Sequence, residues 1–252
     1  MQSHQPITDL YPGPGCDIDL FNQVLQGCAC IDACVSGCEC QLMGPNYRLA
    51  DSGSYVLSFD PKCQPDRPLV ECGRACACVD DLCANRIIQK GPADGLLVKT
   101  APNKDKGVFT TRSLPIGSFV CEYIGEIIGG DEARRRWTKQ TINDHNYIFT
   151  VSEQSVNDED GPEHTYIDPT RLGNIGRFLN HSCDPNCCVV IARHSLPIAR
   201  VAFFTNRQIE NDEELTYSYA SVNNAQRGSK PCNCGAKNCA GFLPNETTTK
   251  MA

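Results

Sequence analysis

Two stretches of this chain decide how its N-terminal part folds: CACIDACVSGCEC at residues 28–40 and CGRACACVDDLC at residues 72–83. Within each stretch the cysteines are separated by one, three or four residues, a spacing that lets thiolates share metal ions. Because a tetrahedral zinc ion takes four ligands, nine cysteines can hold three zinc ions only if three sulfurs each bridge two ions. We therefore expect a three-zinc cluster held by Cys28, Cys30, Cys34, Cys38, Cys40, Cys72, Cys76, Cys78 and Cys83.

The alternative for these cysteines is a scaffold of disulfides. The opening sequence MQSHQPITDL lacks the basic and apolar regions of a secretory signal, so an oxidising compartment is not indicated. Neighbouring C-x-C pairs are also difficult to join into local disulfides. A zinc cluster is therefore the favoured interpretation, and its thiolates and zinc ions would carry far less net charge than the bare thiolates. Cys63 lies between the two stretches and is not assigned to the cluster.

The charge of the chain bears on its partners. The 252 residues carry a formal net charge of −7, which argues against a protein that tracks nucleic-acid phosphates with a basic face. It suits a basic partner, such as a lysine- and arginine-rich peptide tail. The acidic segment SEQSVNDEDGPE, residues 152–163, is either a solvated loop or a lip that attracts such a substrate. The chain contains no apolar run of the ~20 residues that a membrane helix needs.

The chain divides into four parts by composition. Residues 1–27 are predicted to form an irregular arm, residues 28–90 a cysteine-rich domain, residues 91–222 a domain of many short strands, and residues 228–244 a second small cysteine motif. In the third part, short apolar runs alternate with clusters of Gly, Asn, Asp and Pro, a pattern typical of short strands. There is no internal repeat.

One helix is predicted in the third part. Asp131 is expected to cap it, Glu132 lies in its first turn, and Arg134 to Arg136 follow before Trp137.

The cysteines of the last part cannot form a zinc site by themselves. Cys232, Cys234 and Cys239 supply three ligands, and a structural zinc ion needs four. The nearest upstream candidates for the fourth ligand are Cys183, Cys187 and Cys188.

Two polar segments are candidates for chemistry. The segment RFLNHSC, residues 177–183, could not be buried without partners for its polar groups, although its Asn-His pair could also be an ordinary turn. The segment EELTYSY, residues 213–219, places two tyrosines on one face of an extended strand. Paired tyrosine hydroxyls can orient and desolvate an amine; the alternative is that they are ordinary aromatic residues of a strand.

Taken together, these motifs resemble one family. CEYIGE at 121–126, NYIF at 146–149, GNIGRFLNHSCDPN at 173–186, EELTYSY and the final C-x-C-x4-C motif follow the nine-cysteine cluster in the order found in SET-domain lysine methyltransferases. The resemblance covers about residues 28–244. It is to the members with pre-SET and post-SET zinc modules, and in particular to those fused to a mariner-type transposase and to the histone H3 lysine-9 methyltransferases.

The resemblance implies a mainly β fold. The SET fold consists of small curved β-sheets, in which the NHSC segment and the tyrosine strand meet in a pseudoknot. A three-zinc pre-SET module and a one-zinc post-SET module flank it. The resemblance also implies that Cys183 is the fourth ligand of the post-SET zinc ion.

The resemblance further implies a cofactor, S-adenosylmethionine. It is expected to lie against the Lys106-Gly107 turn, with the Asn-His pair holding its adenine and amino-acid ends; the residues implied are Lys106, Gly107, Tyr147, Arg177, Asn180, His181, Phe242 and Leu243, the last two closing over it. The chain departs from the family twice. Asp105-Lys106-Gly107 stands where the family has Gly-aromatic-Gly, so that Asp105 must adopt the backbone angles of a glycine. Ser218 stands where an aspartate is common.

The implied function is a histone-lysine N-methyltransferase in the nucleus, acting on the histone H3 tail of the nucleosome and adding mainly one or two methyl groups. Lysine 9 follows from the pre-SET branch, whereas lysine 36 follows from the transposase-fusion branch. Tyr219 would align the amine, Tyr217 would limit the product, and Tyr147 would line the lysine channel. No membrane association and no sequence-specific nucleic-acid binding are expected. The alternatives are a catalytically weak module that binds a histone tail and a zinc-held scaffold without a small-molecule site.

Overall fold

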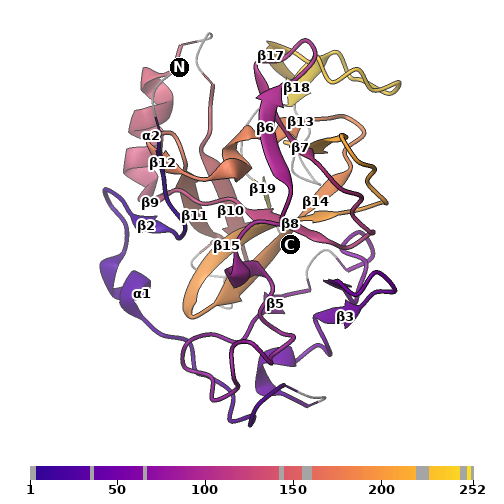
Figure 1. The fold of residues 1–252 in the computed structure, drawn as a ribbon. Helices are drawn as coiled ribbons and strands as arrows, with labels where there is room; N and C mark the ends of the chain where they lie inside the picture. The colour runs from indigo at the N-terminus through magenta and orange to yellow at the C-terminus, as the bar shows by residue number, and fades with distance from the viewer. Residues whose placement is uncertain are drawn as a thin grey trace.

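Short β-strands form most of the regular structure in the computed structural model, which describes residues 4–34, 37–64, 67–141, 145–154, 161–219, 227–244 and 249–250 (Figure 1). The helices among the described residues are α1 (Ile18–Asn22) and α2 (Gly130–Lys139), with the 3-10 turns η1 (Glu39–Gln41), η2 (Ile88–Lys90) and η3 (Ile175–Phe178). The mainly β architecture expected from the sequence is therefore confirmed. No helix of the described residues is both long and apolar enough to cross a membrane.

Three sheets of four or five strands build the body of the molecule. The five-stranded sheet has the order β19 (Thr249–Lys250), β10 (Phe149–Glu153), β11 (Glu163–Asp168), β9 (Glu126–Ile128) and β2 (Tyr11–Pro12). The first four-stranded sheet is β5 (Leu69–Val70), β14 (Cys187–His194), β15 (Leu196–Thr205) and β8 (Phe119–Glu122). The second is β13 (Asn180–His181), β16 (Glu214–Tyr217), β7 (Lys106–Thr110) and β6 (Leu96–Thr100).

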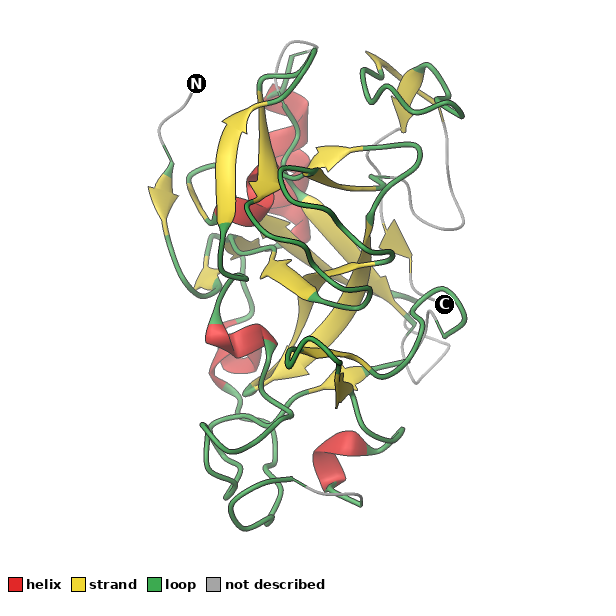
Figure 2. Ribbon diagram, turned by 45° about the vertical axis from the view of Figure 1, so that its right-hand side comes forward, coloured by secondary structure: helices red, strands yellow, loops and turns green. Residues whose placement is uncertain are grey.

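Three two-stranded sheets complete the fold: β1 (Gln5–Pro6) with β12 (Leu172–Gly173), β3 (Tyr47–Leu49) with β4 (Tyr55–Leu57), and β17 (Arg227–Pro231) with β18 (Phe242–Pro244). The cysteine-rich region, residues 28–90, lies at the opposite end of the molecule from the β17–β18 pair. Loops rather than helices or strands make up most of that end (Figure 2).

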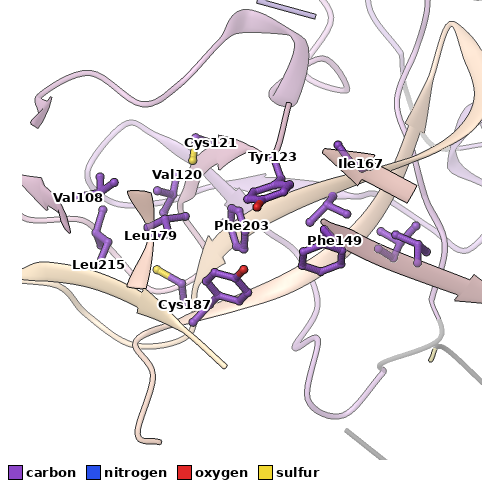
Figure 3. Packing of buried hydrophobic residues seen from close by; sticks show 14 of the residues in the cluster. Val108, Val120, Cys121, Tyr123, Phe149, Ile167, Leu179, Cys187, Phe203 and Leu215 are labelled. Carbon is purple, nitrogen blue, oxygen red and sulfur yellow. The ribbon is translucent and has the colours of Figure 1, made fainter. Parts of the chain in front are cut away.

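The main core lies where these sheets face one another. Phe203 on β15 is fully buried, and its ring centroid lies 4.6 Å from that of Tyr217 and 6.1 Å from that of Tyr123. Phe149 packs against the same two tyrosines (Figure 3). Tilted, edge-on and offset-stacked aromatic pairs at these separations are favourable. The core therefore holds Tyr217, one of the two candidate tyrosines of EELTYSY, in a defined position.

The N-terminal arm is irregular over most of its described length, but it contains two short strands and a helix that its sequence did not predict. Its strands β1 and β2 pair in parallel with β12 and β9, so their backbone groups are satisfied by sheet edges. The Asp9 carboxylate also accepts from the buried Arg200 guanidinium at 2.9 Å, and Arg200 pairs with Glu122 at the same distance. Burial raises the pKa of Glu122 to about 7, although Arg200 opposes the shift. This pairing depends on residues far away in the sequence and left no local signal.

Helix α2 was predicted, but Asp131 does not cap it. The N-cap is Gly129, whose amide donates to the Pro14 carbonyl at 3.0 Å, and Asp131 lies in the first turn. An alanine Cβ at Gly129 would lie 2.4 Å from the Gly15 carbonyl oxygen, so the helix begins where two backbone segments touch. Further along the helix, Arg136 binds Glu126 at 2.9 Å and Asp168 at 2.7 Å, which fixes α2 to β9 and β11.

We predict that Gly129→Ala lowers the free energy of unfolding by about 1–3 kcal/mol, because the added methyl group forces backbone apart. Gly130→Ala is the matched control, since its Cβ would have no atom nearer than 3.5 Å. It should leave stability unchanged or raise it by up to about 1 kcal/mol through helix propensity. Urea unfolding of both variants is the measurement, and equal midpoints would show that the contact with Gly15 is unimportant.

Candidate active site and metal clusters

The sulfurs of the cysteine-rich region converge as the sequence suggested. Three overlapping groups of four have all their sulfurs within 4.8 Å of one another: Cys28, Cys30, Cys34 and Cys38; Cys28, Cys40, Cys72 and Cys76; and Cys28, Cys34, Cys72 and Cys78. Cys83 is buried in the same cluster, whereas Cys63 is exposed. Cys34 and Cys72 each belong to two groups and Cys28 to all three, so sulfurs are shared between groups, as a three-zinc cluster held by nine cysteines requires.

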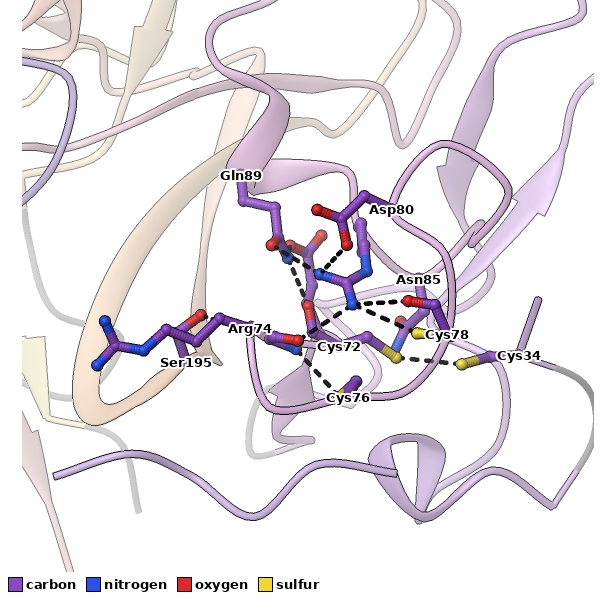
Figure 4. Close-up of polar contacts among 12 residues, drawn as sticks. Cys34, Cys72, Arg74, Cys76, Cys78, Asp80, Asn85, Gln89 and Ser195 are labelled. Atoms are coloured by element: carbon purple, nitrogen blue, oxygen red, sulfur yellow. Dashed lines mark hydrogen bonds and ion pairs between the residues drawn. The ribbon is translucent and has the colours of Figure 1, made fainter. Parts of the chain in front are cut away.

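Hydrogen-bond donors surround these sulfurs. The Asn85 amide donates to Cys72 Sγ at 3.4 Å, the Gly73 amide donates to Cys76 Sγ at 3.3 Å, and the Arg86 guanidinium donates to Cys78 Sγ at 3.4 Å (Figure 4). The Arg86 side chain is only 4% exposed. A buried guanidinium among sulfurs fits an anionic metal–thiolate cluster, because such a cluster keeps a net negative charge. The donor set therefore fits zinc.

A second group of four sulfurs lies in the C-terminal part. Cys183, Cys232, Cys234 and Cys239 have their sulfurs within 4.8 Å of one another. The other two candidates for the fourth position lie elsewhere, since Cys187 is buried in the main core and Cys188 Sγ donates to the Phe204 carbonyl. The structure thus selects Cys183 from the three upstream cysteines.

A cleft of about 1370 Å³ lies between β7, η3, β13, α2, β10 and the β17–β18 pair. It brings together most of the residues that the resemblance implied. Those lining it are Lys106, Tyr147, Arg177, Asn180, His181, Tyr217, Tyr219 and Leu243. Gly107 and Phe242 do not line it. Residues 155–160 of the acidic segment lie outside the described residues, and the flanking Glu153 carboxylate binds Arg193 at 2.6 Å.

The cleft depends on strand β13, which pairs in parallel with β16. The register places Asn180 opposite Thr216 and His181 opposite Tyr217. Asn186, only 2% exposed, ties the two segments together: its Oδ1 accepts from the Thr216 amide and its Nδ2 donates to the Glu214 carbonyl, both at 2.8 Å. Sequence reasoning did not identify Asn186, although it ends the quoted motif GNIGRFLNHSCDPN.

Lys106 and Gly107 do not form a turn, contrary to the expectation for the cofactor site. They begin strand β7, and the turn comes earlier, with Asn103 at a φ of 58°. Asp105 is not among the described non-glycine residues with positive φ, so it does not need the backbone angles of a glycine. A Cβ at Gly107 would lie 2.7 Å from Glu214 Oε1, which explains why this position lacks a side chain.

A polar network of Asn180, Glu214 and Lys104 lies next to Gly107 at the cleft. Asn180 Nδ2 donates to the Lys106 carbonyl at 2.7 Å and to Glu214 Oε1 at 2.8 Å. Lys104 binds the same carboxylate at 2.9 Å, and both of these charged side chains are largely buried. The network fixes Asn180, and neither Lys104 nor Glu214 was singled out from the sequence.

His181 is buried, and both of its ring nitrogens have partners within the protein. Its Nδ1 accepts from the Tyr219 amide at 3.1 Å, which places the ring proton on Nε2, 3.4 Å from Cys183 Sγ. Burial, with a smaller contribution from Lys104, lowers the pKa of His181 to about 4, so the imidazole is neutral at pH 7. His181 therefore connects the tyrosine segment to the second sulfur group.

The candidate tyrosines lie side by side. The ring centroids of Tyr217 and Tyr219 are 4.8 Å apart, and the Tyr219 hydroxyl donates to the Leu179 carbonyl at 2.9 Å. Tyr147 is held through its carbonyl, which accepts from the buried Tyr123 hydroxyl at 2.6 Å. Tyr123 lies in the quoted CEYIGE motif, but its role was not recognisable without the structure.

Arg177 lies against the same aromatic wall. Its guanidinium carbon is 4.5 Å from the Tyr147 ring centroid and 5.4 Å from that of Phe178. Only 9% of the residue is exposed, and its Nε has no hydrogen-bond partner among the described atoms. A buried guanidinium at a cleft, whose Nε has no partner among the described atoms, fits the binding of a cofactor that carries an anionic group.

Comparisons with known proteins agree with this geometry. The model of the SET domain family matches residues 105–220. The chain is 37% identical to the human histone-lysine N-methyltransferase SETMAR over 94% of its own length and 36% of that protein, and 36% identical to the bovine SETMAR over 95% and 81%. It is 33% identical to the chicken histone-lysine N-methyltransferase SUV39H2 over 94% of its length and 59% of that protein.

Solved structures are similar as well. The methyltransferase domain of human SETMAR matches with a TM-score of 0.83 at 36% identity, covering 100% of this chain and 91% of that one. Arabidopsis thaliana SUVH6 in complex with SAM gives 0.75 at 27% identity, over 96% and 50%. KRYPTONITE in complex with mCHH DNA, H3(1-15) peptide and SAH gives 0.71 at 29% identity, over 95% and 47%.

We predict that purified protein contains four zinc ions per chain and that Cys76→Ser unfolds the cysteine-rich region. Structural zinc contributes about 10–16 kcal/mol of apparent binding free energy in small metal modules. Metal analysis and limited proteolysis before residue 90 are the measurements. Cys63→Ser is the control, because Cys63 is exposed and outside the sulfur groups. Intramolecular disulfides without zinc, in protein prepared without oxidants, would contradict the prediction.

Proposed function

The chain belongs to the SET-domain family of histone-lysine N-methyltransferases, and we propose that it methylates a lysine of the histone H3 tail, lysine 9 in preference to lysine 36, in nuclear chromatin. The observation that carries the proposal is the pairing of β13 with β16, which puts Asn180 and His181 in one cleft with Tyr217 and Tyr219. Lysine 9 rather than lysine 36 is supported by KRYPTONITE, whose complex contains H3(1-15), a peptide that includes lysine 9 and ends before lysine 36. The acidic net charge of −7 suits a basic tail.

S-adenosylmethionine, when bound, would supply to the lysine amine a methyl group carried on a sulfonium centre. The amine must be neutral to attack, yet the pKa of a free lysine is about 10.4. A narrow aromatic channel would lower the pKa of the amine by desolvation, and the positive charge of the cofactor's sulfonium would lower it further. The task of the protein is therefore to desolvate and align the amine.

Tyr219 is the residue that we assign to alignment. Its hydroxyl proton is directed to the Leu179 carbonyl, so its oxygen can accept a hydrogen bond from the amine. Tyr147 lines the lysine channel, with the Arg177 guanidinium over its ring. Positioning of well-oriented reactants can contribute about 7–11 kcal/mol to lowering the barrier.

The cofactor is assigned to the residues that the resemblance implied: Lys106, Gly107, Tyr147, Arg177, Asn180, His181, Phe242 and Leu243. Support comes from the cleft, which most of them line, and from the Asn180 network that holds β7 beside it. The zinc ions are structural, since a site closed by four thiolates has no open position for substrate. The division into an arm (1–27), a pre-SET module (28–90), a SET domain (91–222) and a post-SET motif (228–244) remains part of the proposal.

A catalytically weak SET-like module that binds a histone tail is the second candidate. The departure at Asp105-Lys106 is the observation in its favour, because both residues line the cleft and Lys106 begins β7. Retention of Asn180, His181 and both tyrosines in one cleft is the observation against it.

We predict that the protein transfers labelled methyl groups from S-adenosylmethionine to recombinant nucleosomes and that Tyr219→Phe lowers the rate by about 10²-fold or more. The labelled lysine is mapped by mass spectrometry. Loss of one hydroxyl should leave zinc content unchanged and alter the melting temperature little, since what is lost is the hydrogen bond to the Leu179 carbonyl. Tyr55→Phe, an exposed tyrosine outside the cleft, is the control. Near-normal transfer by Tyr219→Phe would refute its role, and peptide binding without any turnover of the wild type would favour the binding module.

We also predict that the product is mainly mono- and dimethyllysine and that Tyr217→Phe shifts it toward trimethyllysine. Tyr217 is 7% exposed and lies beside Tyr219, so its hydroxyl can hold a water in the space that a bulkier amine needs. Loss of such a polar contact costs about 1–3 kcal/mol, and about 1.36 kcal/mol is a factor of ten in rate. A time course on a single-lysine peptide is the measurement. Rapid accumulation of trimethyllysine by the wild type would contradict the argument.

A further inference from the structure

Three side chains with basic groups gather around Phe178 at one end of the cleft. Lys106 Nζ is 5.7 Å from the Phe178 ring centroid, the Arg177 guanidinium carbon is 5.4 Å from it, and the His4 ring centroid is 5.4 Å from it. All four residues line the cleft. Burial, Arg177 and Lys106 lower the pKa of His4, in keeping with two cations close to its ring. The end of the cleft near Phe178 therefore holds two cations, the buried Arg177 and the exposed Lys106.

These cations lack the counter-ions that their neighbours have. Lys104 binds Glu214, and Arg136 binds three carboxylates. Within the described part of the chain, no ion pair joins Lys106 or Arg177 to an acidic side chain. Arg177 is in addition buried with an unpartnered Nε. A buried cation without a counter-ion is costly, so a ligand that brings an anionic group to this place would be bound firmly.

We propose that Lys106 and Arg177 together bind the carboxylate of S-adenosylmethionine, and that Lys106 is thus a residue that selects for this group. The inference rests on the proposed function. The carboxylate is the one anionic group of that cofactor, and the same two cations would repel its sulfonium and its ammonium groups. Lys106 also precedes Gly107, whose missing side chain allows the strand to approach Asn180.

The alternative for Lys106 is a surface lysine that only covers Phe178, since a cation within about 6 Å of a ring is itself favourable. The two readings differ in one respect. If Lys106 binds the carboxylate, its replacement weakens the binding of cofactors that carry a carboxylate. If Lys106 only covers the Phe178 ring, its replacement changes the affinity for all cofactor analogues alike.

The test is isothermal titration of S-adenosylmethionine and of its decarboxylated analogue, without histone and without turnover. Because charge-assisted hydrogen bonds to a carboxylate are strong, the wild type should bind the complete cofactor at least about tenfold more tightly than the analogue. Lys106→Met should reduce this preference by about threefold to tenfold, mainly through weaker binding of the complete cofactor. Arg177→Lys, which keeps the charge but not the forked geometry, should reduce it less.

Lys99→Met is the matched control. Lys99 lies on β6 directly across from Gly107, pairs with Asp212, and does not line the cleft. The Lys99→Met substitution removes one positive charge from the same sheet and should leave the preference for the complete cofactor over its decarboxylated analogue unchanged. If Lys106→Met binds both compounds with the wild-type preference, the inference is wrong while the proposed function stands. If the wild type binds neither compound, both are wrong.

Discussion

The parallel pairing of β13 with β16 is the constraint on which the site depends. Two segments about thirty-five residues apart in the chain meet over two residue pairs, Asn180 with Thr216 and His181 with Tyr217. This short pairing is stabilised by the buried side-chain amide of Asn186. Its nitrogen donates to one backbone carbonyl of β16, and its oxygen accepts from one backbone amide of β16. A buried amide with its partners in place rigidifies a core, and one left unpaired is expensive. The tyrosines and the Asn-His pair are therefore placed together or not at all.

Side chains packed around the β13–β16 pair also fix the residues that form the walls of the cleft. Phe203 and Phe149 pack behind Tyr217, and the Tyr123 hydroxyl holds the carbonyl of Tyr147. On the other side, Arg136 joins α2 to the five-stranded sheet through largely buried ion pairs. Such pairs specify geometry more than they add stability, because desolvation offsets most of the Coulomb attraction. Their consequence here is a helix held at a fixed distance from the tyrosines.

The cysteine-rich region is stabilised in a different way from the sheets. It has little apolar core of its own around the sulfurs: Ile31 and Leu42 are 83% and 84% exposed, and the buried cluster consists of cysteines. Metal coordination can replace hydrophobic burial in such a segment, since binding free energy becomes folding free energy. The Ser195 hydroxyl at the tip of the β14–β15 hairpin accepts from the Arg74 amide, so the region is also docked on the sheets that carry the cleft. The buried Glu71 carboxylate accepts from the Tyr47 hydroxyl and from the amides of Ile87 and Ile88. These bonds fix the segment at which the chain leaves the cysteine-rich region.

The sequence by itself determined much of this protein: the convergence of its cysteines into groups that could share metal, the mainly β architecture, helix α2, and the motifs that meet in the cleft. These follow from ligand counting, from local periodicity and from residue types that share one chemistry. Only the tertiary structure decided which of Cys183, Cys187 and Cys188 joins the last sulfur group, that Gly129 rather than Asp131 starts α2, that Lys106 and Gly107 begin a strand, and that the arm pairs with two sheets. Each of these depends on a contact between residues distant in the chain, such as Gly129 with Gly15 or Gly107 with Glu214. Such contacts leave no periodic signal in the sequence, because their geometry exists only once the sheets have assembled.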